Sequence, residues 1–346
     1  MIHLISPENG AEFSVLTDAQ KDFIKQNDEG TFTRYGNADE SLIDDPSAPA
    51  VCVFRWRVDD PEFPTRLEIS ERDDFSVPSC VDVSGTMQSA TDRDWFSIGR
   101  NFLTGKTYYW RVFQNGEYSE VRALRTFPDR IRPIFAEYVP NFRDIGGRVN
   151  AEGRRLKQGL LFRGKFLEWD SDEYRGLNEN GKKTFVEKLG IKTEIDLREE
   201  KEGKMEVSPA GAGVRYVQVS HDSSWGGTLN DRGMSQLRQI FAVLFDPDSY
   251  PVYFHCFAGA DRTGFIAALI DGIVGMSDGE MMLEYNFTGL FDHRNWNECE
   301  GAEAYFDFLR EKFGDHSYSE LIMLHLTNYG IDAGKLAGLK EFLLED

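Results

Sequence analysis

HCFAGADRTG, residues 255–264, is the stretch that decides the fold of this chain. It begins within PVYFHC (251–256), a continuous apolar run typical of a strand buried on both faces of a parallel sheet. It runs into TGFIAALIDGIVG (263–275), whose apolar residues predict a buried helix. In an open α/β sheet, ligands bind where the carboxyl end of a strand meets the next helix. The sequence therefore predicts a binding site in this stretch.

The residue types in this stretch suit an anionic ligand. Five residues separate Cys256 from Arg262, and a loop of that length can turn successive N–H groups inward around an anion. The helix that begins near Arg262 adds its positive end, and a planar guanidinium fits two phosphate oxygens. A thiol held above these dipoles loses its proton readily, and a thiolate that faces a phosphate is a nucleophile aimed at phosphorus. The alternative, Cys256 as an inert core thiol, leaves this arrangement unexplained.

Strand and helix patterns alternate after residue 135, which indicates an α/β domain with a mainly parallel central sheet flanked by helices. The predicted strands are 191–197, 214–220 and 251–256, and the predicted helices are 177–190, 233–245 and 263–275. Ser277 with Glu280 and Ser317 with Glu320 predict the starts of two further helices. With PDRIRPIF (128–135) as the linker, we expect this domain to cover residues 131–346.

Residues 1–130 show a different pattern, with short β-branched and aromatic runs separated by turn residues. Strands are predicted at 51–58, 65–70, 107–113 and 119–127, which favours a β-sandwich. About 40 residues that a plain sandwich does not need precede the strand at 51–58. Within this insert, near 17–48, Thr17 and Gln20 form a capping-box pattern that predicts a helix. We expect the insert to belong to the N-terminal domain.

Composition excludes several partners. The 346 residues carry 39 Lys and Arg against 59 Asp and Glu, a net charge of −20, so neither nucleic acid nor an anionic membrane is an expected partner. No apolar run approaches the roughly 18 residues of a membrane span. MIHLISPENG (1–10) lacks a signal-peptide pattern, which predicts a cytoplasmic protein, or an extracytoplasmic one if a signal precedes Met1. Cys52 and Cys80 could form a disulfide only in an exported protein.

Four segments, in order along the chain, carry a resemblance to a known family. They are NFRDIGG (141–147), LLFRGKFL (160–167), LGIKTEIDLREEKE (189–202) and HCFAGADRTGF (255–265). Together they resemble the atypical bacterial PtpB-like tyrosine and dual-specificity phosphatases over residues 138–345. In the first half, NFLTGKTYYWRV (101–112) resembles the E–F corner of a fibronectin type III-like domain. That resemblance implies Tyr108 or Tyr109 as the corner tyrosine and Trp56 as the core tryptophan.

The phosphatase resemblance implies a role for each residue of the loop. Cys256 would be the nucleophile that forms a phosphocysteine, Arg262 would bind the phosphoryl group, and Thr263 would stabilise the thiolate. His255 would pack behind the loop, and the amides of Phe257, Ala258, Gly259 and Ala260 would line the phosphate site. No metal or cofactor is implied, because fixed dipoles and positioning can stabilise the transition state. The bacterial family carries Lys where this chain has Ala260, which weakens any assignment to phosphoinositides.

The sequence leaves the general acid and the neighbouring charges open. Asp222 and Asp261 have about equal claims as the acid, and Asp196 has a weaker one. Asp196 could instead be a structural partner of Arg198, and Asp222 a turn residue. The side chains of Arg143, Asp144 and Arg163 could line the substrate pocket or could equally form buried ion pairs.

Three functions compete at this stage. The first is a protein-tyrosine or dual-specificity phosphatase acting on a phosphotyrosine protein or a small phosphomonoester. The second is a phosphatase for inositol phosphates or phosphoinositides. The third is an adaptor that binds phosphopeptides with little turnover, in which the N-terminal domain engages a protein partner.

Overall fold

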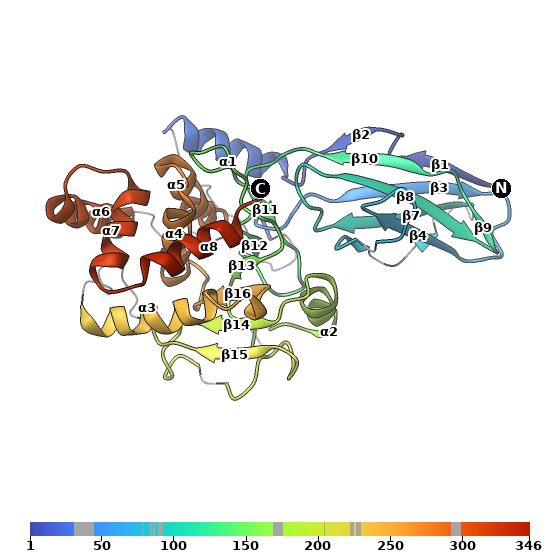
Figure 1. Ribbon diagram of the computed structural model, residues 1–346. Helices are drawn as coiled ribbons and strands as arrows, with labels where there is room; N and C mark the ends of the chain where they lie inside the picture. The colour runs from blue at the N-terminus through green and yellow to red at the C-terminus, as the bar shows by residue number, and fades with distance from the viewer. Residues whose placement is uncertain are drawn as a thin grey trace. The chain divides into compact units, whose positions relative to one another are not determined.

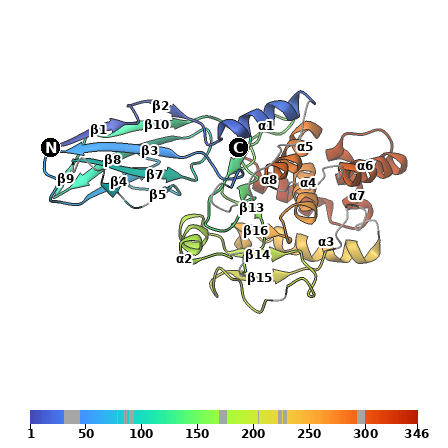
Figure 2. The same cartoon turned by 180° about the vertical axis from the view of Figure 1, so that it is seen from behind.

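The computed structural model describes all residues except 31–44, 78, 84, 86, 89–92, 169–175, 204, 222–224, 226–229 and 292–298. The chain divides into two compact units, which are residues 1–17 with 49–135 and residues 18–48 with 136–346 (Figures 1 and 2). Among the helices described, none is both long and apolar enough to cross a membrane.

The first unit consists of two sheets. One sheet has the strand order β1 (Ile2–Ser6), β3 (Cys52–Val58), β7 (Asp94–Arg100) and β5 (Asp82–Val83), with β6 (Met87–Gln88) also paired to β7. The other has the order β2 (Ala11–Phe13), β10 (Arg122–Thr126), β8 (Thr107–Gln114) and β4 (Thr65–Ser70), with β9 (Glu117–Tyr118) beside β8. All these pairs are antiparallel except β10 with β2, which are parallel. The last strand of this part of the chain is β11 (Arg132–Pro133).

Alternation along the strands builds the core of this unit. Every second residue of β3, including Phe54 and Trp56, is buried, because side chains of a strand point alternately to opposite faces. Phe54 meets Trp110 of the other sheet edge-to-face at 5.1 Å. The hydroxyl of the buried Tyr108 accepts a hydrogen bond from the backbone N–H of Leu103 at 2.8 Å. The four strands predicted in this half therefore lie where the sequence places them.

The second unit is built on a sheet in which β12 (Arg143–Asp144), β13 (Leu161–Gly164), β16 (Val252–His255), β14 (Thr193–Asp196) and β15 (Arg215–Gln218) are successive neighbours. β13, β16, β14 and β15 are mutually parallel, and β12 is antiparallel to β13. The coarse prediction of a mainly parallel sheet with helices is confirmed. The register pairs Asp196 with His255, so both side chains lie on the same face at the carboxyl ends of adjacent strands.

The helices cover both faces of this sheet. The helical elements are α1 (Asp18–Asp28), α2 (Glu179–Lys182), η1 (Lys183–Lys188), α3 (Asp231–Leu244), η3 (Pro247–Ser249), α4 (Asp261–Val274), α5 (Asp278–Asn286), η4 (Phe287–Leu290), α6 (Cys299–Phe313), α7 (Tyr318–Asn328) and α8 (Ala333–Leu343). Val252, Phe254 and Ile195 point into a core shared with α3, α4, α7 and α8. Tyr253, on the other face, packs on Phe185 of η1 with ring centroids 4.9 Å apart. Figure 1 shows α2 on the opposite side of the sheet from α4.

The placement of the insert corrects one prediction. The described residues of the insert, 18–30 and 45–48, belong to the second unit and not to the N-terminal domain. Phe23 of α1 packs edge-to-face on Phe287, with centroids 5.8 Å apart, and Asn286 donates a hydrogen bond to Asn27 at 2.9 Å. The side-chain amide of Gln20 donates to the carbonyls of Pro46 and Ala48. The helix is present as predicted, but its apolar face is buried by residues some 260 positions away, which a local pattern does not reveal.

Candidate active site

The backbone carbonyls of the loop between β16 and α4 accept hydrogen bonds from buried side chains. Asn141 Nδ2 donates to the carbonyls of Ala258 at 3.1 Å and Gly259 at 3.2 Å. Arg163 Nη2 donates to the carbonyls of Gly259 at 2.5 Å and Ala260 at 3.2 Å. In a trans peptide the N–H points opposite to the C=O. The N–H groups of the next residue in each case, Gly259, Ala260 and Asp261, therefore point away from these donors.

The first part of the loop follows the same rule. The carbonyl of Phe257 accepts from the N–H of Phe166 at 3.3 Å, and the carbonyl of Cys256 lies 3.0 Å from His255 Nδ1. All five carbonyls from Cys256 to Ala260 are therefore held in place, which leaves the N–H groups of residues 257–261 on the sides of their peptide planes away from these partners, and consecutive N–H groups of this kind can bind an anion. Gly259 has φ +71°, and a Cβ at this position would lie 2.2 Å from the carbonyl oxygen of Gly164. Only glycine fits there.

Cys256 and Arg262 stand at the two ends of this loop. The Cys256 thiol is buried at 4 % exposure, at the tip of β16, and the α4 N-terminus begins at Asp261. Thr263, in the first turn of α4, is fully buried, and its hydroxyl has no hydrogen-bond partner among the residues described. A buried hydroxyl without a partner is costly unless it serves another group.

Glu202 holds Arg262 by one edge of its guanidinium. Nη1 lies 2.6 Å from Oε2 and Nη2 lies 2.9 Å from Oε1 of Glu202, and Nη1 also donates to the carbonyl of Leu197 at 3.4 Å. Burial alone would lower the pKa of Arg262, but the hydrogen bond with Glu202 and the neighbouring negative charges together raise the pKa above its usual value. Within the described residues, Nε and the second hydrogen of Nη2 carry no hydrogen bond, and these two donors share the other edge. Arg262 therefore keeps a two-donor fork for an oxyanion.

His255 lies behind Cys256, fully buried between two carboxylates. Its Nε2 lies 2.9 Å from Glu194 Oε1, and its Nδ1 lies 3.9 Å from Asp196 Oδ1. Burial alone would lower the pKa of His255, but the charge of Asp196 and the hydrogen bond with Glu194 raise it to about 9. As an imidazolium, His255 donates from Nδ1 to the carbonyl of Cys256. It lies behind the loop and binds the carbonyl of Cys256.

Asp196 is a structural partner, which is the alternative that the sequence left open. It is fully buried and accepts hydrogen bonds from the backbone and guanidinium of Arg198 and from the hydroxyl of Tyr216 at 2.8 Å. Burial alone would raise the pKa of Asp196, but the charge of His255 and the bonds from Arg198 lower it. A buried carboxylate committed to these donors is not placed to protonate a leaving group.

Arg143 and Arg163 also prove to be buried ion-pair residues rather than pocket-lining ones. Arg143 Nε lies 2.7 Å from Glu284 Oε1, and Arg163 Nη1 lies 2.6 Å from Glu284 Oε2, with all three side chains at most 2 % exposed. Burial alone would raise the pKa of Glu284, but the charges of Arg143 and Arg163 lower it to about 2. Asp144 accepts from the N–H groups of Gly146 and Gly159 and is likewise buried. All three side chains are therefore committed to contacts inside the protein.

Of the aspartates proposed as the general acid, Asp261 lies in the loop region. It is half-buried, and its Oδ1 is 3.4 Å from the hydroxyl of Tyr285. Asp222 lies outside the described residues. The structure therefore removes Asp196 and leaves the other two candidates open.

Sequence reasoning missed Glu202, Glu284 and Asn141. Glu202 and Asn141 both fall in segments that carried the family resemblance, LREEKE and NFRDIGG, so the segments were found without their roles. Glu284 gives a weaker signal, since it is a single acidic residue in a short helix, and only the folded chain brings two arginines to it.

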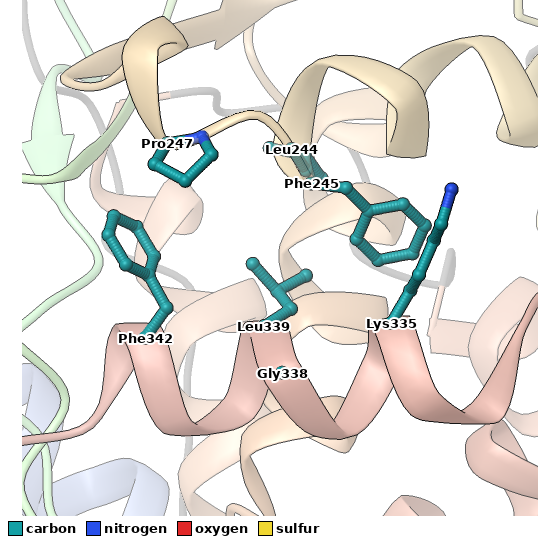
Figure 3. Close-up of a pocket in the computed structure, with 7 residues that line it drawn as sticks. All are labelled: Leu244, Phe245, Pro247, Lys335, Gly338, Leu339 and Phe342. Atoms are coloured by element: carbon teal, nitrogen blue, oxygen red, sulfur yellow. The ribbon is translucent and has the colours of Figure 1, made fainter.

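A separate hollow lies away from Cys256. It has a volume of about 260 Å³ between the end of α3 and α8 and is lined by Leu244, Phe245, Pro247, Lys335, Gly338, Leu339 and Phe342 (Figure 3). The lining is mainly apolar and offers no nucleophile or carboxylate, so this hollow is not a candidate active site. Among the described residues, no three or more His, Cys, Asp or Glu side chains gather as metal ligands do.

Residues 134–319, more than half of the chain, match the Tyrosine phosphatase family. The chain therefore belongs to that family, as the strand–loop–helix site indicates.

Two curated proteins are similar to part of the chain. It is 28 % identical over 174 residues to a provisionally named tyrosine-protein phosphatase of Cupriavidus necator, covering 42 % of this chain and 59 % of that protein. It is 27 % identical over 192 residues to the triple specificity protein phosphatase PtpB of Mycobacterium tuberculosis, covering 42 % of this chain and 65 % of that protein. The chain thus spans less than two thirds of the length of either relative.

Among solved structures, the core catalytic domain of the PP-IP phosphatase SIW14 of S. cerevisiae is similar over 52 % of this chain and 94 % of that domain. The identity is 16 % and the TM-score is 0.31, which is too low to establish a shared fold.

Proposed function

We propose that this chain hydrolyses phosphomonoesters, with phosphotyrosine in proteins as the main substrate, through a phosphocysteine intermediate on Cys256. One observation carries the proposal: five consecutive carbonyls, from Cys256 to Ala260, are bound at the rear of the loop, so the corresponding N–H groups face the front. Cys256 and the two-donor edge of Arg262 close that front. The membership in the Tyrosine phosphatase family supports the same chemistry.

The first chemical step is an in-line displacement at phosphorus. The Cys256 sulfur forms a bond to phosphorus as the bond from phosphorus to the ester oxygen breaks, and the leaving oxygen takes a proton from an aspartic acid. The loop amides and Arg262 stabilise the charge that spreads over the three equatorial oxygens.

Water completes the cycle. It attacks the phosphorus of the phosphocysteine and gives a proton to the aspartate that acted as the acid, the P–S bond breaks, and orthophosphate leaves while the sulfur returns as a thiolate. Thr263, whose buried hydroxyl has no partner among the described residues, is the donor available to stabilise that thiolate. No step uses a metal or a cofactor.

The test is a substrate panel assayed in the presence of a chelator. We expect p-nitrophenyl phosphate and phosphotyrosine peptides to be hydrolysed, and the activity to be lost in Cys256→Ser. A preference for inositol phosphates or phosphoinositides would select the second function. Tight phosphopeptide binding with negligible turnover by the native chain would select the adaptor.

The first unit is proposed as a fibronectin type III-like module that engages a protein partner. The bond from Leu103 to the Tyr108 hydroxyl, five residues on, has the form of a tyrosine corner, and Trp56 is fully buried. A pull-down with residues 1–130 is not a suitable test, since the described residues 18–30 and 45–48 belong to the second unit. The test should instead compare the binding of protein partners by the full chain and by its surface variant Tyr118→Glu. The Tyr118 side chain is 49 % exposed.

A further inference from the structure

Residues 18–30 and 45–48, here called the brace, come from the first half of the chain but pack within the second unit. Phe23 of α1 contacts Phe287, and Asn27 accepts a hydrogen bond from Asn286. The fully buried Gln20 donates from its amide to the carbonyls of Pro46 and Ala48, so α1 and the turn at 45–48 are held together.

The turn at 45–48 reaches the residue that holds the phosphate loop. The Ser47 hydroxyl accepts a hydrogen bond from the backbone N–H of Asn141 at 2.8 Å. The same hydroxyl donates to Asp45 Oδ1 at 2.6 Å, so its lone pair is aimed at Asn141. Ser47 is 3 % exposed and Asn141 is 1 % exposed, so water is not available to replace this bond.

The backbone of Asn141 has an unfavourable conformation, and its side chain binds the phosphate loop. Its backbone is in the left-handed region at φ +57°, a conformation that Asn adopts more readily than most residues but still at a cost. Its side chain spans the rear of the site, with Nδ2 donating to the carbonyls of Ala258 and Gly259 and Oδ1 accepting from Arg143. A shift of the Asn141 backbone would therefore move the two carbonyls that turn the loop amides forward.

We propose that Ser47 is a positioning residue for the phosphate loop, acting through Asn141, and that the brace is thereby part of the catalytic unit. This inference rests on the proposed phosphatase function for its kinetic consequence. Its structural consequence, the order of loop 257–261, is independent of turnover.

The experiment compares three variants of the full chain. Ser47→Ala removes the acceptor, Ser47→Thr keeps a hydroxyl, and Ser76→Ala is the matched control. Ser76 makes the same turn with Asp74, its N–H and hydroxyl lying 2.9 and 2.6 Å from Oδ1, as Ser47 does with Asp45. Ser76 lies in the first unit, whereas the loop lies in the second.

Two measurements are made on each variant. In p-nitrophenyl phosphate turnover, we expect Ser47→Ala to lower kcat about three- to tenfold with KM changed less than about twofold, because the loop amides act most strongly in the transition state. In amide hydrogen exchange without substrate, we expect the N–H groups of Phe166 and Gly264, which donate to the loop carbonyls of Phe257 and Ala260, to exchange faster by a similar factor. Ser47→Thr should restore both values.

The outcomes separate the two proposals. Normal turnover and exchange in Ser47→Ala, indistinguishable from Ser76→Ala, overturn the positioning role of Ser47. An inactive native chain whose loop exchange still depends on Ser47 overturns the phosphatase function and supports the positioning role.

Discussion

The rear and the front of loop 256–262 are opposite in character. At the rear, Asn141, Arg163 and His255 bind carbonyls, and each of these side chains is fully or almost fully buried. At the front stand the N–H groups, Cys256 and one edge of Arg262, with no protein acceptor described for that edge. A row of unpaired N–H groups is the costly part of an anion site. Hydrogen bonds at the rear hold the five carbonyls of residues 256–260 in place. This fixes the orientation of the peptide groups and so keeps their N–H groups directed toward the front.

The rear also supplies charge. Arg143 and Arg163 both face the single carboxylate of Glu284, which leaves one positive charge beneath the loop. Burial and the charge of Arg163 lower the pKa of Arg143 to about 9, so it stays charged at neutral pH.

The largest expected effect is on stability, from removing a charge at the rear. Arg163→Met leaves Glu284 with Arg143 as its one arginine partner and removes one of the hydrogen-bond donors from each of the carbonyls of Gly259 and Ala260. We expect the free energy of unfolding to fall by about 3–5 kcal/mol, measured by urea denaturation. Arg154→Met is the control, because Arg154 pairs with the exposed Glu341 and should cost about 0–1 kcal/mol. Equal losses of unfolding free energy in the two variants would show that the buried cluster around Glu284 stabilises the fold no more than an exposed ion pair does.

The next effect is on turnover, from changing the front. Arg262→Lys keeps the positive charge but loses the planar fork, so only a point charge faces the phosphate. We expect kcat for p-nitrophenyl phosphate to fall about 10²–10³-fold, as for removal of a transition-state donor, with little change in unfolding. Turnover within threefold of the native chain would mean that Arg262 does not bind the phosphoryl group.

The rear should also make the free energy of unfolding depend on pH, through His255, in the absence of substrate. The folded pKa of His255, about 9, lies above its unfolded value of about 6.5, so protonated His255 stabilises the fold fully below pH 6.5. This stabilisation is lost as the pH rises through 9. We expect the free energy of unfolding to fall by about 1 kcal/mol per pH unit in that window, and His255→Gln to lack this slope. Parallel curves for the two proteins would show that His255 is neutral when folded.

The smallest effect concerns the contact that orients Arg262. Glu202→Gln keeps the shape but loses the charge of the acceptor, so we expect kcat/KM to fall about five- to tenfold. Glu199→Gln is the control in the same turn, since Glu199 pairs with the exposed Lys201. A gain in activity for Glu202→Gln would mean instead that Glu202 blocks the phosphate site.

Much of the fold and the front of the site could be predicted from the sequence, because both are local. Cys256, the loop and Arg262 are consecutive, and the flanking strand and helix have clear apolar patterns. The rear could not be predicted, since Arg143, Arg163 and Glu284 come from three distant segments. Periodicity does not show which arginine meets which carboxylate. For the same reason, α1 was predicted as a helix but assigned to the wrong domain.

The central claim is that the Cys256 sulfur takes the phosphoryl group. The direct measurement is a rapid acid quench of the native chain with a labelled phosphotyrosine peptide, followed by mass spectrometry of the protein fragments. The account predicts one phosphoryl group on the fragment that contains Cys256, formed as tyrosine is released and absent in Cys256→Ser. Release of tyrosine with no phosphoryl group on the protein, or with the group on another residue, would contradict it.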